Sequence, residues 1–209
     1  MPSPKQQIPW PDYLPGPSED LLALGVIALT YGQLEGMFQH VFSAVTSLNE
    51  IQASAIFQRI PNNVRQDILF QMMAQTTLPD VVKDQVQYFG LGFKSCAANR
   101  HAIMHSHSAG VSTSQSRGTR GFLLQKYSKA GNKLVCPATL ADLRKAADDT
   151  HNYVGFGAWI VSDIRTLLSL RDNDDEASFR SISLRHRPLP PTELIWLPEK
   201  DVLTAPRPL

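Results

Sequence analysis

Apolar residues follow Pro79 at alternating steps of four and three residues, and no other feature of the sequence restricts the fold as strongly. The members of this series are Val82, Val86, Phe89, Phe93 and Cys96. Residues three and four apart lie on one face of an α-helix, so the spacing predicts an amphipathic helix over about 80–107. Other elements must cover that apolar face, and we therefore expect a helical bundle.

Three other segments are also predicted to be helical. Apolar residues three and four apart predict one long helix over about 20–48 and another over about 139–170. The second of these begins at Thr139, with Asp142 three residues later as its capping partner. A further helical region covers about 50–76 and is interrupted by one proline.

The segment before the last predicted helix differs in composition. Residues 108–120 are small and polar, which predicts a loop, and residues 122–135 have the pattern of a β-hairpin with glycine in its turn. The predicted fold is therefore mainly α, a four-helix bundle with a small β-hairpin inserted before the last helix.

Proline-rich segments at both ends predict the domain boundaries. Residues 1–18 contain six of the 15 prolines. We expect an extended N-terminal arm over 1–18, one helical domain over 19–171 and an extended proline-rich tail over 172–209.

Composition excludes several classes of protein. The net charge of +1 gives no global attraction to nucleic acid or membrane, so any RNA contact requires a local patch. Two cysteines are too few for a disulfide framework or a four-cysteine zinc site. The N-terminal segment lacks the apolar core of a signal peptide, and no stretch reaches the ~18 apolar residues of a spanning helix. We expect a cytoplasmic protein that does not associate with membranes.

Arg100 lies on the centre line of the apolar face predicted for residues 80–107. A guanidinium at such a position is unfavourable unless it pairs with an acid, faces a partner or binds a phosphate. Asn99, His101 and His105 are its neighbours near the end of the predicted helix. This cluster is the candidate functional site of the chain.

Structural roles for the same residues remain open. Arg100 could form a buried salt bridge to Glu35 or Asp67. His105 could be a helix-end histidine, favoured by the negative end of the helix dipole. The trio His101, His105 and His107 could ligate a metal, although no carboxylate or cysteine pair stands among them.

The spacing Arg100-x4-His105, at the end of the third helix of a four-helix bundle, resembles the Arg-x4-6-His motif of HEPN ribonucleases. The family usually has a polar residue directly after the arginine, and His101 fits that place. The segment 31–35 (Tyr-Gly-Gln-Leu-Glu) is also similar, since it sets an acidic residue beside the apolar face of the first helix. The resemblance spans about 20–170.

Other arginine–histidine pairs also match one of the spacings that the Arg-x4-6-His pattern allows, and only their location separates them from the candidate site. Arg144, the partner of His151, lies one turn into a predicted helix rather than at its end. Arg180, the partner of His186, lies in the predicted tail. His107 is a second possible partner of Arg100 at the same place.

The resemblance implies a metal-independent endoribonuclease that acts as a homodimer, needs no cofactor and has a toxin or defence role. His105 would transfer protons, Arg100 would hold the phosphate, and His101 and Asn99 would support them. Two protomers would bring their motifs together, which explains an arginine on an apolar face. The expected partners are RNA, a second copy and a neutralising or regulatory protein.

The alternative is a non-catalytic HEPN-like helical interaction or regulatory protein, favoured by the neutral net charge and the long arms.

Overall fold

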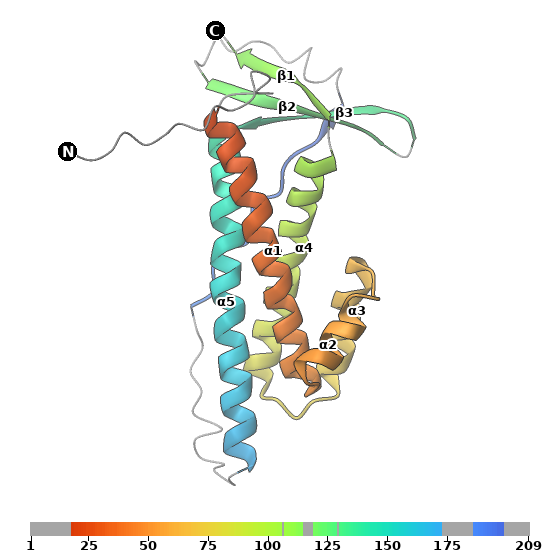
Figure 1. The fold of residues 1–209 in the computed structure, drawn as a ribbon, viewed down its shortest axis with the longest axis vertical. Coiled ribbons are helices and arrows are strands. Elements are labelled where there is room, and N and C mark those ends of the chain that lie inside the picture. The colour runs from red at the N-terminus through yellow and green to blue at the C-terminus, as the bar shows by residue number, and fades with distance from the viewer. Residues whose placement is uncertain (1–17, 106, 115–118, 129, 173–185, 199–209) are drawn as a thin grey trace, which may run out of the picture.

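The computed structural model describes residues 18–105, 107–114, 119–128, 130–172 and 186–198, with only the backbone of 18, 62, 63, 107–114, 119–123 and 172. Five helices lie in these ranges: α1 (Ser18–Thr46), α2 (Glu50–Phe57), α3 (Asn62–Ala74), α4 (Asp80–His105) and α5 (Leu140–Asp172). Three strands lie between α4 and α5, and a two-residue strand follows α5 (Figure 1). The strands are β1 (His107–Ser114), β2 (Thr119–Tyr127), β3 (Lys133–Thr139) and β4 (Leu197–Pro198).

Three long helices form the body of the molecule. α1 and α5 run parallel, and α4 runs in the opposite direction beside them (Figure 1). An ion pair of 3.7 Å between Glu19 and Arg144 joins the starts of α1 and α5. The sheet lies across this end of the body, where α4 also ends, while α2 and α3 lie beside the other half (Figure 1).

The apolar face predicted for the third helix is the buried face of α4. Its members are each no more than 2% exposed: Val82, Val86, Phe89, Phe93 and Cys96. Aromatic rings from three helices meet there, with Phe38 of α1 at 4.4 Å from Phe93 and 5.7 Å from Phe57 of α2 between ring centroids. The prediction of a mainly helical fold built around this helix is therefore confirmed.

A second apolar cluster joins the sheet to the helices. Leu124 of β2 and Cys136 of β3 are paired across the strands, and both are buried against Ile103 of α4 and Leu143 of α5. The predicted start of the last helix is confirmed at the same place. The backbone N–H of Thr139 donates to the Asp142 carboxylate at 2.9 Å, and the N–H of Asp142 donates to the Thr139 hydroxyl at 3.2 Å.

The predicted interruption at Pro61 is confirmed, whereas the loop predicted over 108–120 was wrong. The region 50–76 forms two helices because Pro61 lies at the start of α3, where its ring fixes the backbone outside α2. The predicted loop 108–120 largely belongs to β1 and β2, so the predicted hairpin is part of an antiparallel sheet with the strand order β1-β2-β3-β4. β1 consists of small and polar residues, and its pairing with β2 rather than an apolar alternation defines it as a strand.

α1 is more apolar than the sequence analysis expected. An 18-residue window of it has a mean hydropathy of 1.4, so among the described residues it is the one helix that could cross a membrane by length and composition. A core helix of a soluble protein passes the same test. One face of α1 places Ile27, Leu34 and Phe38 in the core, whereas Leu22 and Leu29 are exposed. The apolar residues of α1 therefore lie on two faces, and the core of this chain covers only one.

Gly92 allows α4 and α5 to approach closely. A Cβ atom at this position would lie 1.8 Å from Cε1 of Tyr153, whose ring is fully buried. We predict that Gly92→Ala lowers the free energy of unfolding by about 1–3 kcal/mol, because the ring cannot move without disturbing the core. Chemical denaturation followed by circular dichroism measures this change. Gly155→Ala is the matched control, since open space surrounds Gly155 on α5. It should leave stability unchanged or raise it by up to about 1 kcal/mol, and an equal loss in both variants would contradict the prediction.

Candidate functional site

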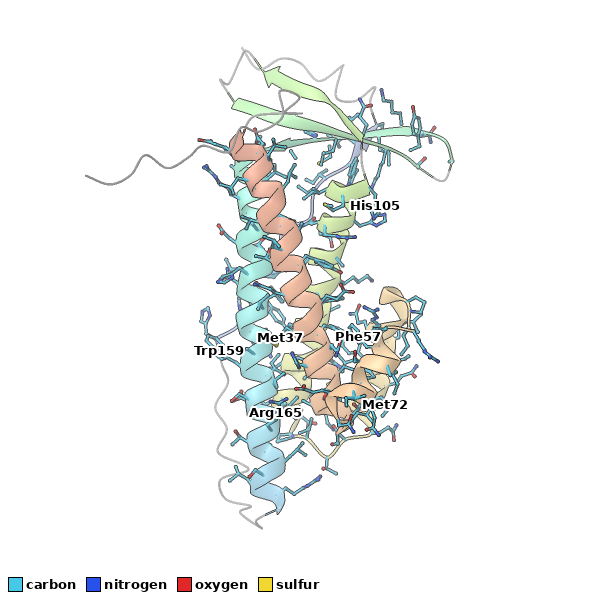
Figure 2. The ribbon with its side chains drawn as sticks, in the orientation of Figure 1. Met37, Phe57, Met72, His105, Trp159 and Arg165 are labelled. Atoms are coloured by element: carbon cyan, nitrogen blue, oxygen red, sulfur yellow. The ribbon has the colours of Figure 1, made fainter. Side chains whose placement is uncertain are left out.

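The predicted site residues lie in the last two turns of α4, next to the sheet. α4 ends at His105, two residues before the predicted end. Figure 2 shows His105 just beneath the sheet, on the side from which the β2–β3 hairpin projects. Arg100 and His101 lie in the same two turns at this end of α4, and Asn99 is buried.

Arg100 is half-buried, and its guanidinium carbon lies 5.5 Å from the centre of the Tyr31 ring on α1. Burial raises the pKa of Tyr31 to about 12; nearby Glu35 adds to this rise and Arg100 opposes it. Tyr31 is therefore a neutral phenol at physiological pH, and its ring face attracts the guanidinium without neutralising it.

No carboxylate in the described part of the chain pairs with Arg100. The expected salt bridge to Glu35 is wrong, because Glu35 accepts a hydrogen bond of 2.8 Å from Arg65 of α3. Arg65 also donates to the carbonyl of Ile60 and lies over the Phe57 ring. Glu35 therefore connects α1 to α3, and the five donors of Arg100 are left for an anion from outside the described residues.

His101 and His105 lie one turn apart on α4, and both are exposed. Their ring centroids are 4.5 Å apart. The described residues contain no group of three histidine, cysteine or acidic side chains that could hold a metal, and the side chain of His107 lies outside them. Two imidazoles in contact beside a guanidinium can bind an anion and exchange protons with it.

Asn99 has a different environment from its neighbours. Its side chain is buried, its Nδ2 donates to the carbonyl of Thr192 at 2.8 Å, and its Oδ1 accepts from the N–H of Leu194 at 2.9 Å. Asn99 was expected to support catalysis, but its amide is used to hold the main chain of the C-terminal segment. It is thus a positioning residue, which fixes the helix directly before Arg100.

We call residues 186–198 the strap, because this extended segment lies along α4 and α5 and ends in β4 beside β3. The carboxylate of Asp149 on α5 accepts from the N–H of Thr192 at 3.1 Å and from the Lys145 ammonium at 2.9 Å. Near the other end of the strap, the hydroxyl of Tyr88 on α4 donates to the carbonyl of Pro188 at 2.7 Å. The body therefore recognises the main chain of the strap at several points. No periodicity in the sequence indicated these contacts.

Removal of the Asn99 amide tests whether the strap holds the end of α4. We predict that Asn99→Ala lowers the free energy of unfolding by about 1–3 kcal/mol, because the carbonyl of Thr192 and the N–H of Leu194 lose their partner. Hydrogen exchange at the Leu194 amide should become faster. Ser95→Ala is the control, since Ser95 makes an exposed hydrogen bond to Glu193 of the same strap; it should change stability by less than about 0.5 kcal/mol. Equal effects of the two substitutions would argue against an anchoring role for Asn99.

The chain was also compared with known proteins. No protein-family model matches it, and no match is found among curated proteins or among solved structures. Its function is therefore inferred from its own residues.

Proposed function

We propose that this chain is a cytoplasmic, homodimeric endoribonuclease of HEPN type, with its catalytic residues at the end of α4. One observation carries the proposal. Arg100 is a half-buried cation without an acidic partner among the described residues, and two exposed histidines, whose rings are in contact, follow it one and five residues later on α4. A guanidinium held in this way is suited to bind a phosphate with two hydrogen bonds.

The reaction needs a base, an acid and a group that stabilises charge on phosphorus. His105 takes the proton from a ribose 2′-hydroxyl, and the 2′-oxygen attacks the adjacent phosphorus. The bond from phosphorus to the 5′-oxygen breaks, and that oxygen leaves after receiving a proton from a second imidazole. Arg100 binds the non-bridging oxygens, where negative charge grows during attack. The products are a 2′,3′-cyclic phosphate and a 5′-hydroxyl, so neither water nor a metal takes part in the cleavage step.

The arrangement of helices supports the same proposal. α4 is buried on one side and presents Arg100 and the two histidines at its end, where they are accessible to RNA. We infer that α1, α4, α5 and the α2–α3 pair correspond to a HEPN-like bundle, and that the sheet is an addition to it. In this interpretation a second protomer supplies the second imidazole, because a two-fold axis near the end of α4 brings two copies of the site together.

Surface residues near Arg100 are compatible with such a dimer. Met104, four residues after Arg100, is 48% exposed, although it lies on the side of α4 that carries the apolar series. An exposed methionine beside a half-buried arginine is typical of the centre of an interface.

The catalytic role predicts a large loss of cleavage on substitution. Arg100→Ala and His105→Ala should each reduce RNA cleavage by about 10²–10⁴-fold, because each removes a group that acts on the reacting atoms. Cleavage of labelled RNA measures the loss, and the products should carry 2′,3′-cyclic phosphate or 3′-phosphate ends. Activity should persist in EDTA.

His151→Ala and His186→Ala are the matched controls, since both histidines are exposed and have the same sequence relation to an arginine. Both variants should cut RNA as well as the unmodified chain does. Arg100→Ala should also stay folded, as judged by its melting temperature. The ribonuclease proposal fails if the purified chain cuts no RNA, or if the double variant Arg100→Ala/His105→Ala retains full activity.

The dimer proposal makes a separate prediction. Met104→Glu should convert the dimer into a monomer, because it places a charge in the interface. Light scattering on a sizing column measures the mass. Leu91→Glu is the control on the same helix, since Leu91 is 58% exposed and lies on another side of α4. A monomeric unmodified chain, or equal loss of the dimer in both variants, would contradict the proposal.

A second candidate is a non-catalytic HEPN-like interaction protein, and the outer face of α1 favours it. Leu22 and Leu29 are exposed on this face, and a Cβ added at Gly25, Gly32 or Gly36 would meet nothing within 4 Å. A helix with exposed leucines and accessible backbone can accept another helix closely. This function predicts a stable folded chain with no cleavage to lose in the Arg100 and His105 variants.

A further inference from the structure

The net charge of the chain is close to zero, but its acidic residues are unevenly distributed along the sequence. Residues 85–141, which we call the basic segment, contain no aspartate or glutamate in 57 positions. At the chain-wide frequency of 19 in 209, about five acidic residues would be expected there. The segment has seven lysines and arginines and three of the six histidines, whereas the other residues have 13 lysines and arginines against 19 acids.

The described part of the basic segment runs along α4 to the sheet at one end of the molecule. It comprises most of α4 together with β1, β2 and β3, and the sheet lies across the end of α4 (Figure 1). On α4, Lys94, His101 and His105 are seven and four residues apart, so they share one face, and all three are exposed. This face extends for about 16 Å from Lys94 to His105. The candidate catalytic residues therefore lie between Lys94 and the sheet.

The β2–β3 hairpin, which projects from the sheet on the side where His105 lies, carries an exposed aromatic ring (Figures 1 and 2). Tyr127 at the end of β2 is 69% exposed, and Lys133 is its partner across the strands. Next to it, the ammonium of Lys126 lies 3.9 Å from the centre of the Trp196 ring. Exposed aromatic rings between basic residues are typical of surfaces that stack single-stranded bases and contact phosphates.

Four acidic residues on α4 or on elements packed against it have other partners in the described structure. Glu35 is bound by Arg65, Asp84 by Arg187 of the strap, and Asp149 by Lys145. Glu193 of the strap accepts a hydrogen bond from Ser95, which lies about 100° around α4 from Lys94. None of these four carboxylates is therefore paired with Lys94 on the exposed face of α4.

We propose that the exposed face of α4 from Lys94 to His105 and the β2–β3 hairpin form a binding surface for single-stranded RNA. Phosphates contact Lys94 on α4, a base stacks on Tyr127 of the hairpin, and the strand between these points passes over His101 and His105, in the two turns of α4 that also carry Arg100. The final step, cleavage at Arg100, depends on the function proposed above. Binding does not, because it requires only charge and stacking.

The test uses the full chain and an RNA analogue that this chemistry cannot cut. A fluorescein-labelled 2′-O-methyl oligoribonucleotide of about 12 nucleotides has no free 2′-hydroxyl and falls within the usual range of site sizes. Fluorescence anisotropy is measured at several salt concentrations. Lys94→Glu should lower the slope of log K against log salt concentration by about 0.7, the value for one phosphate contact with a single strand. Tyr127→Ala should weaken binding by about 5- to 150-fold, the range reported for loss of one stacked base.

Arg165→Glu is the charge-matched control. Arg165 is exposed on α5, in the half of the body away from the sheet (Figure 2). Its substitution should leave the affinity and the salt slope unchanged, and all three variants should keep the melting temperature of the unmodified chain. An equal effect of Arg165→Glu and Lys94→Glu would overturn the proposal, because it would indicate attraction without a defined surface.

The remaining outcomes separate this proposal from the ribonuclease proposal. Binding that responds to Lys94 and Tyr127 supports the surface even if unmodified RNA is not cut. If neither Lys94→Glu nor Tyr127→Ala changes the rate of RNA cleavage, the ribonuclease proposal stands and the proposed binding surface is wrong. Absence of binding at low salt, or stronger binding to phosphatidylserine vesicles or poly-glutamate than to the oligoribonucleotide, also overturns it.

Discussion

The contact between Gly92 and Tyr153 fixes how α4 lies against α5, and the geometry of the candidate site follows from it. With this register, Asn99 of α4 and Asp149 of α5 both reach the main chain of Thr192 in the strap. Because Arg100 directly follows the anchored Asn99, its side chain leaves α4 toward α1, where Tyr31 lies. The candidate site is therefore positioned by helix packing and by one extended segment, and rigid elements of this kind hold functional groups more accurately than loops do.

Much of the helical body could be predicted from the sequence, because apolar side chains at three- and four-residue steps define a buried face locally. This holds for α1, α4 and α5 and for the cap formed by Thr139 and Asp142. β1 could not be predicted in this way, since its serines, threonines and glycines show no alternation. Its strand conformation depends on backbone hydrogen bonds to β2, and the β propensity of its own residues does not specify that pairing.

For the candidate site, the sequence identified the unusual residue but not its surroundings. Arg100 was recognisable because it interrupts an apolar series, and its pairing with Glu35 was a reasonable expectation from charge alone. The structure instead joins Glu35 to Arg65, a contact between residues 30 positions apart. It joins Asn99 to Thr192 across 93 positions. Such contacts arise only when the helices pack, and neither composition nor short-range spacing can specify them.

The parallel arrangement of α1 and α5 has a consequence for the nascent chain. α1 is made first, but its most extensive packing is against α5, which begins only at Leu140. At ribosomal rates of about 5–20 residues per second, roughly 5–20 s pass between the synthesis of α1 and that of α5, the helix that covers it. During that interval its apolar core face, with Ile27, Leu34 and Phe38, is exposed together with the outer leucines. A newly made α1 therefore presents an apolar surface that chaperones and membranes can bind before the rest of the chain exists.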